Sequence, residues 1–501
     1  MIVPRFVLAA TLATAASCAV VPSEDHVSLS RRAANGIKDP GFYPGGKDTY
    51  KTGWKELPPV EGATIDNSTF KFGKHKAQLT AYMTENIDKS KIKRAVIALH
   101  GDYRDAWNQF KFVNLSLQNA IKDGDVKNDE VAILAPMFFS QKDNGAYPAD
   151  KDGVSTSKAL IWDTTTWGNG DDAIYPSFMK NGKLNNTEYK DLDGTYHDAK
   201  SKSKSEKKSS KKSKSTGSSE KKRRGVNVKN GSQSQRQGPD VSPFDVIDTL
   251  IAYFLDKKQF PNLGTVVVSG FSLGAQLNQR YIALRKDPSD TRINFGVSSP
   301  GSFVYLTKDR VTDTSKCKGF NDYKYGLEGE LPRYVKRNNV PSDPDSVMKR
   351  YFNATTYYMV GAQDDAKGDP SCEAQAQGND HVQKVSNWVR KILPKLDIEK
   401  YDSAGVTKDG IPKNTYFTTI EGVAHQAYGI YLTAQGAQML FIDDYFKQGE
   451  NAKGPRPLKG GAANADKQTN KGKDQEGSSS HVAASVSMTT LMVALTMIAI
   501  L

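Results

Sequence analysis

The sequence predicts an α/β fold with a mostly parallel central sheet and helices on both faces. Near-continuous apolar runs, typical of strands buried on both faces, occur at 94–99, 131–135, 265–268, 356–360 and 416–420. Stretches with helical periodicity separate them, and this alternation is typical of parallel sheets. The glycine-flanked turn Gly270 to Gly274 follows the third run directly and leads into a helical stretch.

Helices are expected at 105–123, 243–256, 275–285, 381–393 and 426–446. The helix at 243–256 is the easiest to justify. Ser242 can cap it, Pro243 suits its first turn, and Asp245 complements the positive N-terminal dipole. Its apolar residues recur at helical spacing and predict a face that packs on the core; they are Val246, Ile247, Leu250, Ile251 and Phe254.

A long insertion separates the second apolar run, 131–135, from the helix predicted at 243–256. Its first part, 146–192, contains Trp162, Trp167 and a glycine-rich turn at 168–170. We expect a loop or small lid over the edge of the sheet, and we expect the insertion and the loops around Trp162, Trp167 and Tyr305 to form the walls of a substrate pocket. The second part, 194–240, is rich in Lys and Ser and cannot bury a core, so it is predicted to be disordered.

The net charge of +13 is concentrated in this insertion, where Lys200 to Arg224 contains twelve Lys and Arg against two Glu. Such a run can bind phosphates, but no aromatic residues are interleaved for base stacking, so nucleic acid is not the expected partner. A solvated loop, or attachment to anionic cell-wall polymers or lipids, fits the composition better. Lys222 to Arg224 is also a possible processing site.

Both chain ends predict export. Residues 1–19 have Arg5, an apolar run and small residues at the end, as secretory signal peptides do. A polar segment, 20–52, then precedes a domain predicted to span 53–448. A low-complexity stalk, 449–477, leads to an uncharged apolar tail within 478–501, typical of a glycosylphosphatidylinositol signal attached at Gly477 or Ser478. A simple tail anchor is the alternative; either places the protein outside the cell on the membrane or wall.

The cysteines and sequons fit the same route. Cys18 leaves with the signal peptide, so Cys317 and Cys372 can form one disulfide or remain two buried thiols. Asn-x-Ser/Thr sequons, which would be glycosylated on a eukaryotic secretory route, occur at Asn67, Asn114, Asn185, Asn230 and Asn353.

Ser272 is the candidate nucleophile because it stands at the centre of a G-x-S-x-G turn between strand and helix. A serine hydroxyl needs a base, and the base needs an acid to orient it. On such turns the acid and then the histidine follow the serine, each on a loop after a later strand. Asp364 and His425 meet this order. Their rivals are His381, within a predicted helix, and the aspartates Asp365 and Asp369.

An oxyanion hole requires two backbone donors. Leu273, directly after the nucleophile, is expected to supply one. The loop that follows the run 94–99 begins with His100-Gly101, and Asp102 or Tyr103 is expected to supply the other. The imidazole of His100 itself is expected to be structural.

Together, His100-Gly101, the G-F-S-L-G turn, Gly361-x-x-Asp364 and Gly422-x-x-His425 resemble the α/β-hydrolase superfamily over roughly 74–447. The stretches 274–281 and 321–327 look like those of secreted fungal hydrolase-like proteins of undefined substrate. Many of these have histidine before the serine, where Phe271 stands here, which affects pocket polarity rather than the triad.

This resemblance implies the α/β-hydrolase fold and a serine hydrolase without metal or organic cofactor, acting on a small-molecule or polymeric ester or related acyl bond. The alternative is an inactive hydrolase-fold surface protein with a role in adhesion or in the cell wall. Neither acyl-chain preference nor the choice between ester and amide follows from the sequence.

Overall fold

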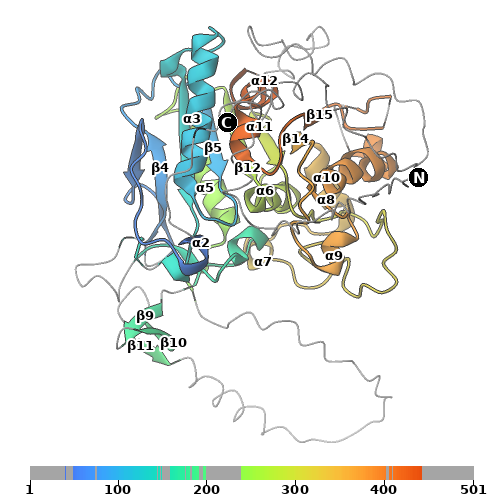
Figure 1. Ribbon diagram of the computed structural model, residues 1–501, viewed down its shortest axis with the longest axis horizontal. Coiled ribbons are helices and arrows are strands. Elements are labelled where there is room, and N and C mark those ends of the chain that lie inside the picture. The colour runs from blue at the N-terminus through green and yellow to red at the C-terminus, as the bar shows by residue number, and fades with distance from the viewer. Residues whose placement is uncertain are drawn as a thin grey trace, which may run out of the picture. The chain divides into compact units, whose positions relative to one another are not determined.

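An eight-stranded sheet forms the centre of the computed structural model (Figure 1). The model describes residue 40 and residues 49–442, except 74–75, 144, 147, 149–157, 175–176, 181–182, 191–195, 199–237, 402–404 and 409. In spatial order the strands are β1 (Ala63–Asp66), β4 (Thr80–Thr84), β6 (Val131–Met137), β5 (Arg94–Leu99), β12 (Thr265–Phe271), β13 (Ile293–Ser298), β14 (Thr355–Gly361) and β15 (Thr415–Ile420). The six strands from β6 to β15 are parallel, whereas β1 and β4 join antiparallel.

The sheet divides the core into two layers, because successive side chains along a strand point to opposite faces. In β12, Val266 and Val268 pack into one apolar cluster and Val267 into the other. In β5, Val96 and Ala98 join the same cluster as Val267. Burial on both faces explains why the central strands are near-continuous apolar runs.

Helices cover both layers. The longer ones are α3 (Ala106–Lys122), α5 (Pro243–Leu255), α6 (Leu273–Leu284), α8 (Pro344–Phe352) and α10 (His381–Asn387), and the shorter ones are α2 (Thr49–Thr52), α7 (Arg333–Arg337), α9 (Cys372–Gln375), α11 (Ala427–Tyr431) and α12 (Ala434–Ala437). In Figure 1, α3 in blue lies beside α11 in orange-red, although α3 follows β5 early in the chain and α11 follows β15, the last strand. Within the described part of the chain, no helix is both long and apolar enough to cross a membrane.

The predicted helix at 243–256 is confirmed together with its cap. The Ser242 hydroxyl accepts from the Phe244 N–H at 2.9 Å, and Asp245 accepts from the Ser242 N–H at 2.8 Å. The helix expected at 426–446 is wrong as one element. It divides into α11, α12 and a π-helical turn at 438–442, because the Thr433 side chain caps a new helix by accepting from the Gly436 N–H.

The insertion contributes both to the core and to a small second sheet. Trp162 and Trp167 are fully buried, as is Tyr305, so these rings belong to the core. Shorter strands also form: β10 (Lys183–Lys190) pairs antiparallel with β9 (Ser177–Lys180) and with β11 (Tyr196–Asp198). β11 lies within the part of the insertion that is predicted to be disordered, 194–240. Residues 199–237, with Lys200 to Arg224, lie outside the described residues.

Two further short pairs complete the described strands. They are β2 (Lys71–Phe72) with β3 (Ala77–Gln78), which is antiparallel, and β7 (Phe139–Ser140) with β8 (Ile161–Trp162), which is parallel. The predicted signal peptide, stalk and anchor signal lie outside the described residues.

Candidate active site

Ser272 stands on a strained turn between β12 and α6. Its backbone has φ 55° and ψ −119°, a conformation that non-glycine residues adopt at a cost and that recurs at functional sites. The flanking glycines are required by space. A Cβ on Gly270 would lie 2.3 Å from the Gly274 carbonyl oxygen, and a Cβ on Gly274 would lie 2.4 Å from the His100 carbonyl oxygen. The turn is thus a nucleophile elbow that only small flanking residues permit.

The structure brings Ser272, His425 and Asp364 together from three separate loops. The Ser272 hydroxyl lies 3.0 Å from His425 Nε2, and His425 Nδ1 lies 2.9 Å from Asp364 Oδ2. These are hydrogen-bonding distances for a nucleophile with its base and for a base with its acid. Asp364 is buried, whereas Ser272 is partly exposed to solvent.

The loops that carry the acid and the histidine hold each other in place. The N–H groups of Ala362 and Gln363 donate to the carbonyls of Ile420 and Val423, both at 2.8 Å. Gly361 must lack a side chain there, since a Cβ would lie 2.3 Å from the Val423 carbonyl oxygen. The parallel pairing of β14 with β15 therefore places Asp364 beside His425 at the carboxyl edge of the sheet.

Electrostatics prepare His425 to accept a proton. Burial alone would lower the pKa of His425, but the Asp364 carboxylate outweighs it and raises that pKa above its ordinary value, with a smaller contribution from Asp102. Burial alone would raise the pKa of Asp364, but His381 and His425 hold it well below its usual range. Asp364 is therefore ionised at neutral pH.

The three rivals for these roles lie in different surroundings. Asp365 is exposed to solvent. Asp369 accepts a hydrogen bond from the Tyr325 hydroxyl at 2.7 Å and lies 3.6 Å from the Lys324 ammonium. His381 does reach the site, where its Nδ1 lies 2.9 Å from Asp364 Oδ1. The sequence suggested His381 only as a competitor of His425, whereas the structure shows both histidines on one carboxylate.

Asp364, His381 and His425 are also a set of donor atoms that could hold a metal ion, because these atoms lie within 4.8 Å of one another. The two imidazole rings, however, stack with an interplanar angle of 22° and centroids 4.3 Å apart. Nitrogen lone pairs of stacked rings run side by side instead of converging on one point, as a tetrahedral site requires. The stacking of the two rings therefore does not suit a tetrahedral metal centre.

The loop after β5 passes directly beside Ser272. A Cβ on Gly101 would lie 3.4 Å from Ser272 Cβ. The loop's carbonyls face donors of the protein: Gly101 accepts from His100 Nδ1, Asp102 from Arg104 Nη1, and Tyr103 from Trp54 Nε1. The N–H and C=O of a trans peptide point in opposite directions, so the N–H groups of Asp102 and Tyr103 are turned away from these donors.

Leu273 is the first residue of α6, so its N–H has no acceptor within the helix. The second oxyanion donor stays a prediction between Asp102 and Tyr103.

The imidazole of His100 is hydrogen-bonded to the backbone through both ring nitrogens. Its Nδ1 donates to the Gly101 carbonyl at 2.7 Å and its Nε2 accepts from the Phe138 N–H at 2.9 Å. Burial lowers the pKa of His100 to about 3, so the ring is neutral and structural.

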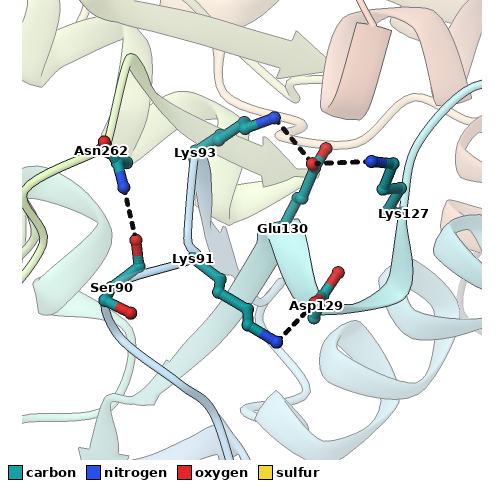
Figure 2. Close-up of a pocket in the computed structure, with 7 residues that line it drawn as sticks. All are labelled: Ser90, Lys91, Lys93, Lys127, Asp129, Glu130 and Asn262. Atoms are coloured by element: carbon teal, nitrogen blue, oxygen red, sulfur yellow. Dashed lines mark hydrogen bonds and ion pairs between the residues drawn. The ribbon is translucent and has the colours of Figure 1, made fainter.

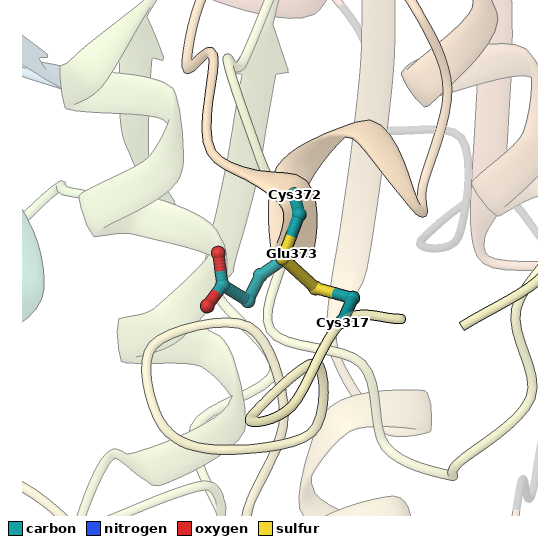
Figure 3. A group of neighbouring side chains, drawn as sticks. All are labelled: Cys317, Cys372 and Glu373. Carbon is teal, nitrogen blue, oxygen red and sulfur yellow. A yellow bond between two sulfur atoms is a disulfide. The ribbon is translucent and has the colours of Figure 1, made fainter. Parts of the chain in front are cut away.

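Cys317 and Cys372 form a disulfide that joins a loop after β13 to α9 (Figure 3). The nearby Glu373 completes a group of potential metal donors, but the sulfur atoms are bonded to each other and are not free thiolates. Of the sequons, Asn67, Asn114 and Asn353 are partly exposed, Asn185 lies in β10, and Asn230 is outside the described residues.

A surface pocket of about 350 Å³ lies at the other edge of the sheet (Figure 2). Lys93 and Glu130, which line it, directly precede β5 and β6, whereas the triad follows the carboxyl ends of the strands. Lys91 pairs with Asp129 and Lys93 with Glu130. None of Ser272, Asp364 and His425 lines this pocket.

No family model and no curated protein matches the chain. Solved structures resemble it at low identity. The poly(aspartic acid) hydrolase-1 of Sphingomonas sp. KT-1 is 14% identical with a TM-score of 0.39, over 74% of this chain and 96% of that one. The poly(3-hydroxybutyrate) depolymerase of Bordetella parapertussis is 13% identical with a TM-score of 0.37, over 77% and 92%. The siderophore hydrolase of Aspergillus nidulans is 8% identical with a TM-score of 0.32, over 77% and 96%.

The fold assignment rests on features of this chain. Its sheet is mostly parallel with helices on both faces, and its elbow stands between β12 and α6. The acid and the histidine follow β14 and β15, in the chain order Ser, Asp, His that belongs to this fold. The chain is therefore an α/β-hydrolase-fold protein.

Proposed function

We propose that this protein is a serine hydrolase that cleaves a carboxylic ester or a related acyl bond. The observation that supports the proposal most directly is the hydrogen-bonded series Ser272 Oγ, His425 Nε2 and Nδ1, and Asp364 Oδ2. A chance cluster of polar side chains would not also place the serine on an elbow at φ 55°. The cost of that backbone conformation fits a residue held in position for chemistry.

In the proposed mechanism, Ser272 Oγ attacks the acyl carbon while His425 Nε2 takes its proton. Asp364 holds the imidazole by its Nδ1–H and stabilises the imidazolium. The oxyanion of the tetrahedral intermediate accepts from the Leu273 N–H and from the N–H of Asp102 or Tyr103. His425 then returns the proton to the leaving group, and water hydrolyses the acyl-enzyme by the same steps.

Labelling with a fluorophosphonate probe tests this proposal. The purified protein should be labelled at Ser272, and Ser272→Ala should lose all labelling. Ser90→Ala, which changes a serine at the opposite edge of the sheet, should be labelled like the wild type. Labelling of Ser272→Ala at another residue, or a folded wild-type protein that does not react, would count against it and favour the inactive surface protein.

The location proposed for this enzyme is the outer side of the plasma membrane or the cell wall, where a lipid anchor would attach it. The support is the signal-like N-terminal sequence, the uncharged apolar C-terminal sequence and the disulfide between Cys317 and Cys372. A phosphatidylinositol-specific phospholipase should release the native protein from intact cells. Retention after this treatment, with release by detergent, would favour a simple tail anchor.

A further inference from the structure

Two histidines share the carboxylate of Asp364, and the proposed mechanism uses only one of them. His425 Nδ1 lies 2.9 Å from Oδ2, and His381 Nδ1 lies 2.9 Å from Oδ1. The two rings stack, with centroids 4.3 Å apart and an interplanar angle of 22°. Phe271 contacts the His425 ring as well, with centroids 4.7 Å apart. The His425 ring therefore packs against the rings of Phe271 and His381. The His381 ring also contacts Asp364.

The backbone ties His381 to the loop of the acid. His381 opens α10, and its N–H donates to the Ala366 carbonyl at 3.2 Å. The next N–H, of Val382, donates to the Asp364 carbonyl at 3.4 Å. A Cβ on Gly368 would lie 2.6 Å from His381 Nε2, so this ring nitrogen packs against the Gly368 backbone. His381 is thus placed to act on Asp364, while His425 holds the hydrogen bond to Ser272.

The charge state of His381 follows from its surroundings. Its side chain is 4% exposed, and burial lowers its pKa below the ordinary value although Asp364 opposes this. The positive charges of a protonated His425 and of Lys384 act in the same direction as burial. A neutral imidazole whose Nδ1 faces a carboxylate carries its proton on Nδ1. This N–H is not aligned with Oδ1 as a hydrogen bond requires, so its effect is that of a nearby dipole.

Such a dipole has a predictable effect on the base. The ionisable groups that face the two rings are Asp364, Asp102 and Lys384. The His381 N–H lies near Oδ1, although it is not aligned with it, and its positive end compensates part of the carboxylate charge. The remaining charge stabilises the His425 imidazolium less strongly than an unshared carboxylate would.

We propose that His381 is a positioning residue of the triad, which orients Asp364, supports the ring plane of His425 and limits how strongly Asp364 stabilises the imidazolium. The inference rests on the proposed hydrolase function. It assigns His381 a role through Asp364 and His425 and no contact with substrate.

Two substitutions separate the functions of the ring. His381→Phe keeps a stacked ring and removes the N–H, whereas His381→Asn keeps a donor near the position of Nδ1 and removes the ring. The rate of fluorophosphonate labelling at Ser272 is measured against pH in the full-length protein. Gln383→Ala, which changes an exposed residue of α10, is the control.

In His381→Phe the unshared carboxylate should move the acid limb of the labelling rate upward by roughly half to one pH unit. His381→Asn should keep the acid limb of the wild type and of Gln383→Ala, with a lower maximal rate because the support of the ring is lost. A residue that merely fills space would leave the acid limb unchanged in both variants. Equal acid limbs in His381→Phe and the wild type would overturn the inference.

A second measurement tests the effect of His381 on His425 without relying on hydrolase activity. The His425 Cε1–H resonance is followed by NMR through the same pH range in wild type and variants. If the wild type is not labelled, the hydrolase proposal fails, but the titration of His425 still decides whether His381 acts on it. If His381→Phe does not fold, His381→Leu replaces it, with the same expected upward shift and the same contradicting result.

Discussion

Arg104 and Asp143 form a buried, bidentate ion pair that contacts the loop after β5, which is expected to bind the oxyanion. Arg104 Nε lies 2.7 Å from Asp143 Oδ2, and Nη2 lies 3.0 Å from Oδ1. The third guanidinium nitrogen, Nη1, donates to the Asp102 carbonyl at 3.0 Å. Asp143 also accepts from the N–H groups of Trp54 and Ser140. This pair therefore orients the peptide between Asp102 and Tyr103.

We predict that Arg104→Met slows acyl transfer by about ten- to a hundredfold, because the loop loses the donor that orients its peptide. The free energy of unfolding should fall by about 3 to 5 kcal/mol, since Asp143 is left as an uncompensated buried charge. Rates with a chromogenic ester and urea unfolding curves measure the two effects.

Arg292→Met is the matched control, because Arg292 pairs with Asp290 at the surface and away from the loop. Loss of this partly exposed pair should cost less than about 1 kcal/mol and leave the rate unchanged. If Arg104→Met is destabilised but turns over ester like the wild type, the pair serves stability alone.

The pH dependence follows from the raised pKa of His425. Ser272 can transfer its proton only to neutral His425, so kcat/KM should fall as the pH decreases through that pKa. Because Asp364 raises the pKa, the midpoint of the fall should lie above the ordinary value of 6.5. Titration of kcat/KM against an uncharged ester from pH 5 to 9 measures it.

Replacing the acid tests the cause of that shift. Asp364→Asn removes the carboxylate that raises the pKa of His425, so the remaining acid limb should move to lower pH. The maximal rate should fall by roughly four orders of magnitude, because an amide does not hold the imidazole in the required tautomer. An acid limb that stays in place would mean that another group controls the protonation of His425.

Local pattern predicts most of the parallel strands but misses β13, which lies inside the sheet between β12 and β14. The runs in β5, β12 and β14 are nearly continuous in apolar residues because helices cover both faces of the sheet. The sequence does not predict β13, since Asn294 and Gly296 interrupt its apolar residues. Asn294 is buried in the sheet all the same, and a Cβ on Gly296 would lie 2.7 Å from Met439 Sδ. Such close packing between distant segments leaves no local signal.

The site shows the same division. Ser272, Asp364 and His425 could be predicted because strand ends and chain order restrict where they occur. The contact of His381 with Asp364 could not be predicted, since it depends on how α10 packs against β14. Composition does not predict that Trp162 and Trp167 are fully buried, because their contacts come from distant segments. His100 packs against Trp167, with centroids 4.7 Å apart.

The disulfide gives a prediction on stability. Cys317 and Cys372 are 55 residues apart, so removing the cross-link should lower the free energy of unfolding by about 4 kcal/mol through the greater entropy of the unfolded chain. The double variant Cys317→Ser/Cys372→Ser and the wild type in reducing agent should unfold at the same urea concentration. A destabilised double variant beside an unchanged reduced wild type would show that the serines, and not the missing bond, are responsible.

The glycines of the elbow allow a test of space against backbone conformation. Gly274→Ala places a Cβ 2.4 Å from the His100 carbonyl oxygen, and neither backbone can yield without moving β5 or α6. We expect a loss of stability of about 3 kcal/mol or more and no labelling of Ser272. Thermal unfolding and probe labelling at a permissive temperature measure the two effects.

Gly124→Ala is the matched comparison, because Gly124 has φ +79° and nothing within 4 Å of its Cβ position. It should cost about 1 to 2 kcal/mol from the left-handed backbone alone and leave labelling intact. Gly124→Asn should recover part of this loss, since asparagine tolerates that conformation. If Gly274→Ala were no worse than Gly124→Ala, the contact between α6 and the His100 carbonyl would not be what restricts the elbow to glycine.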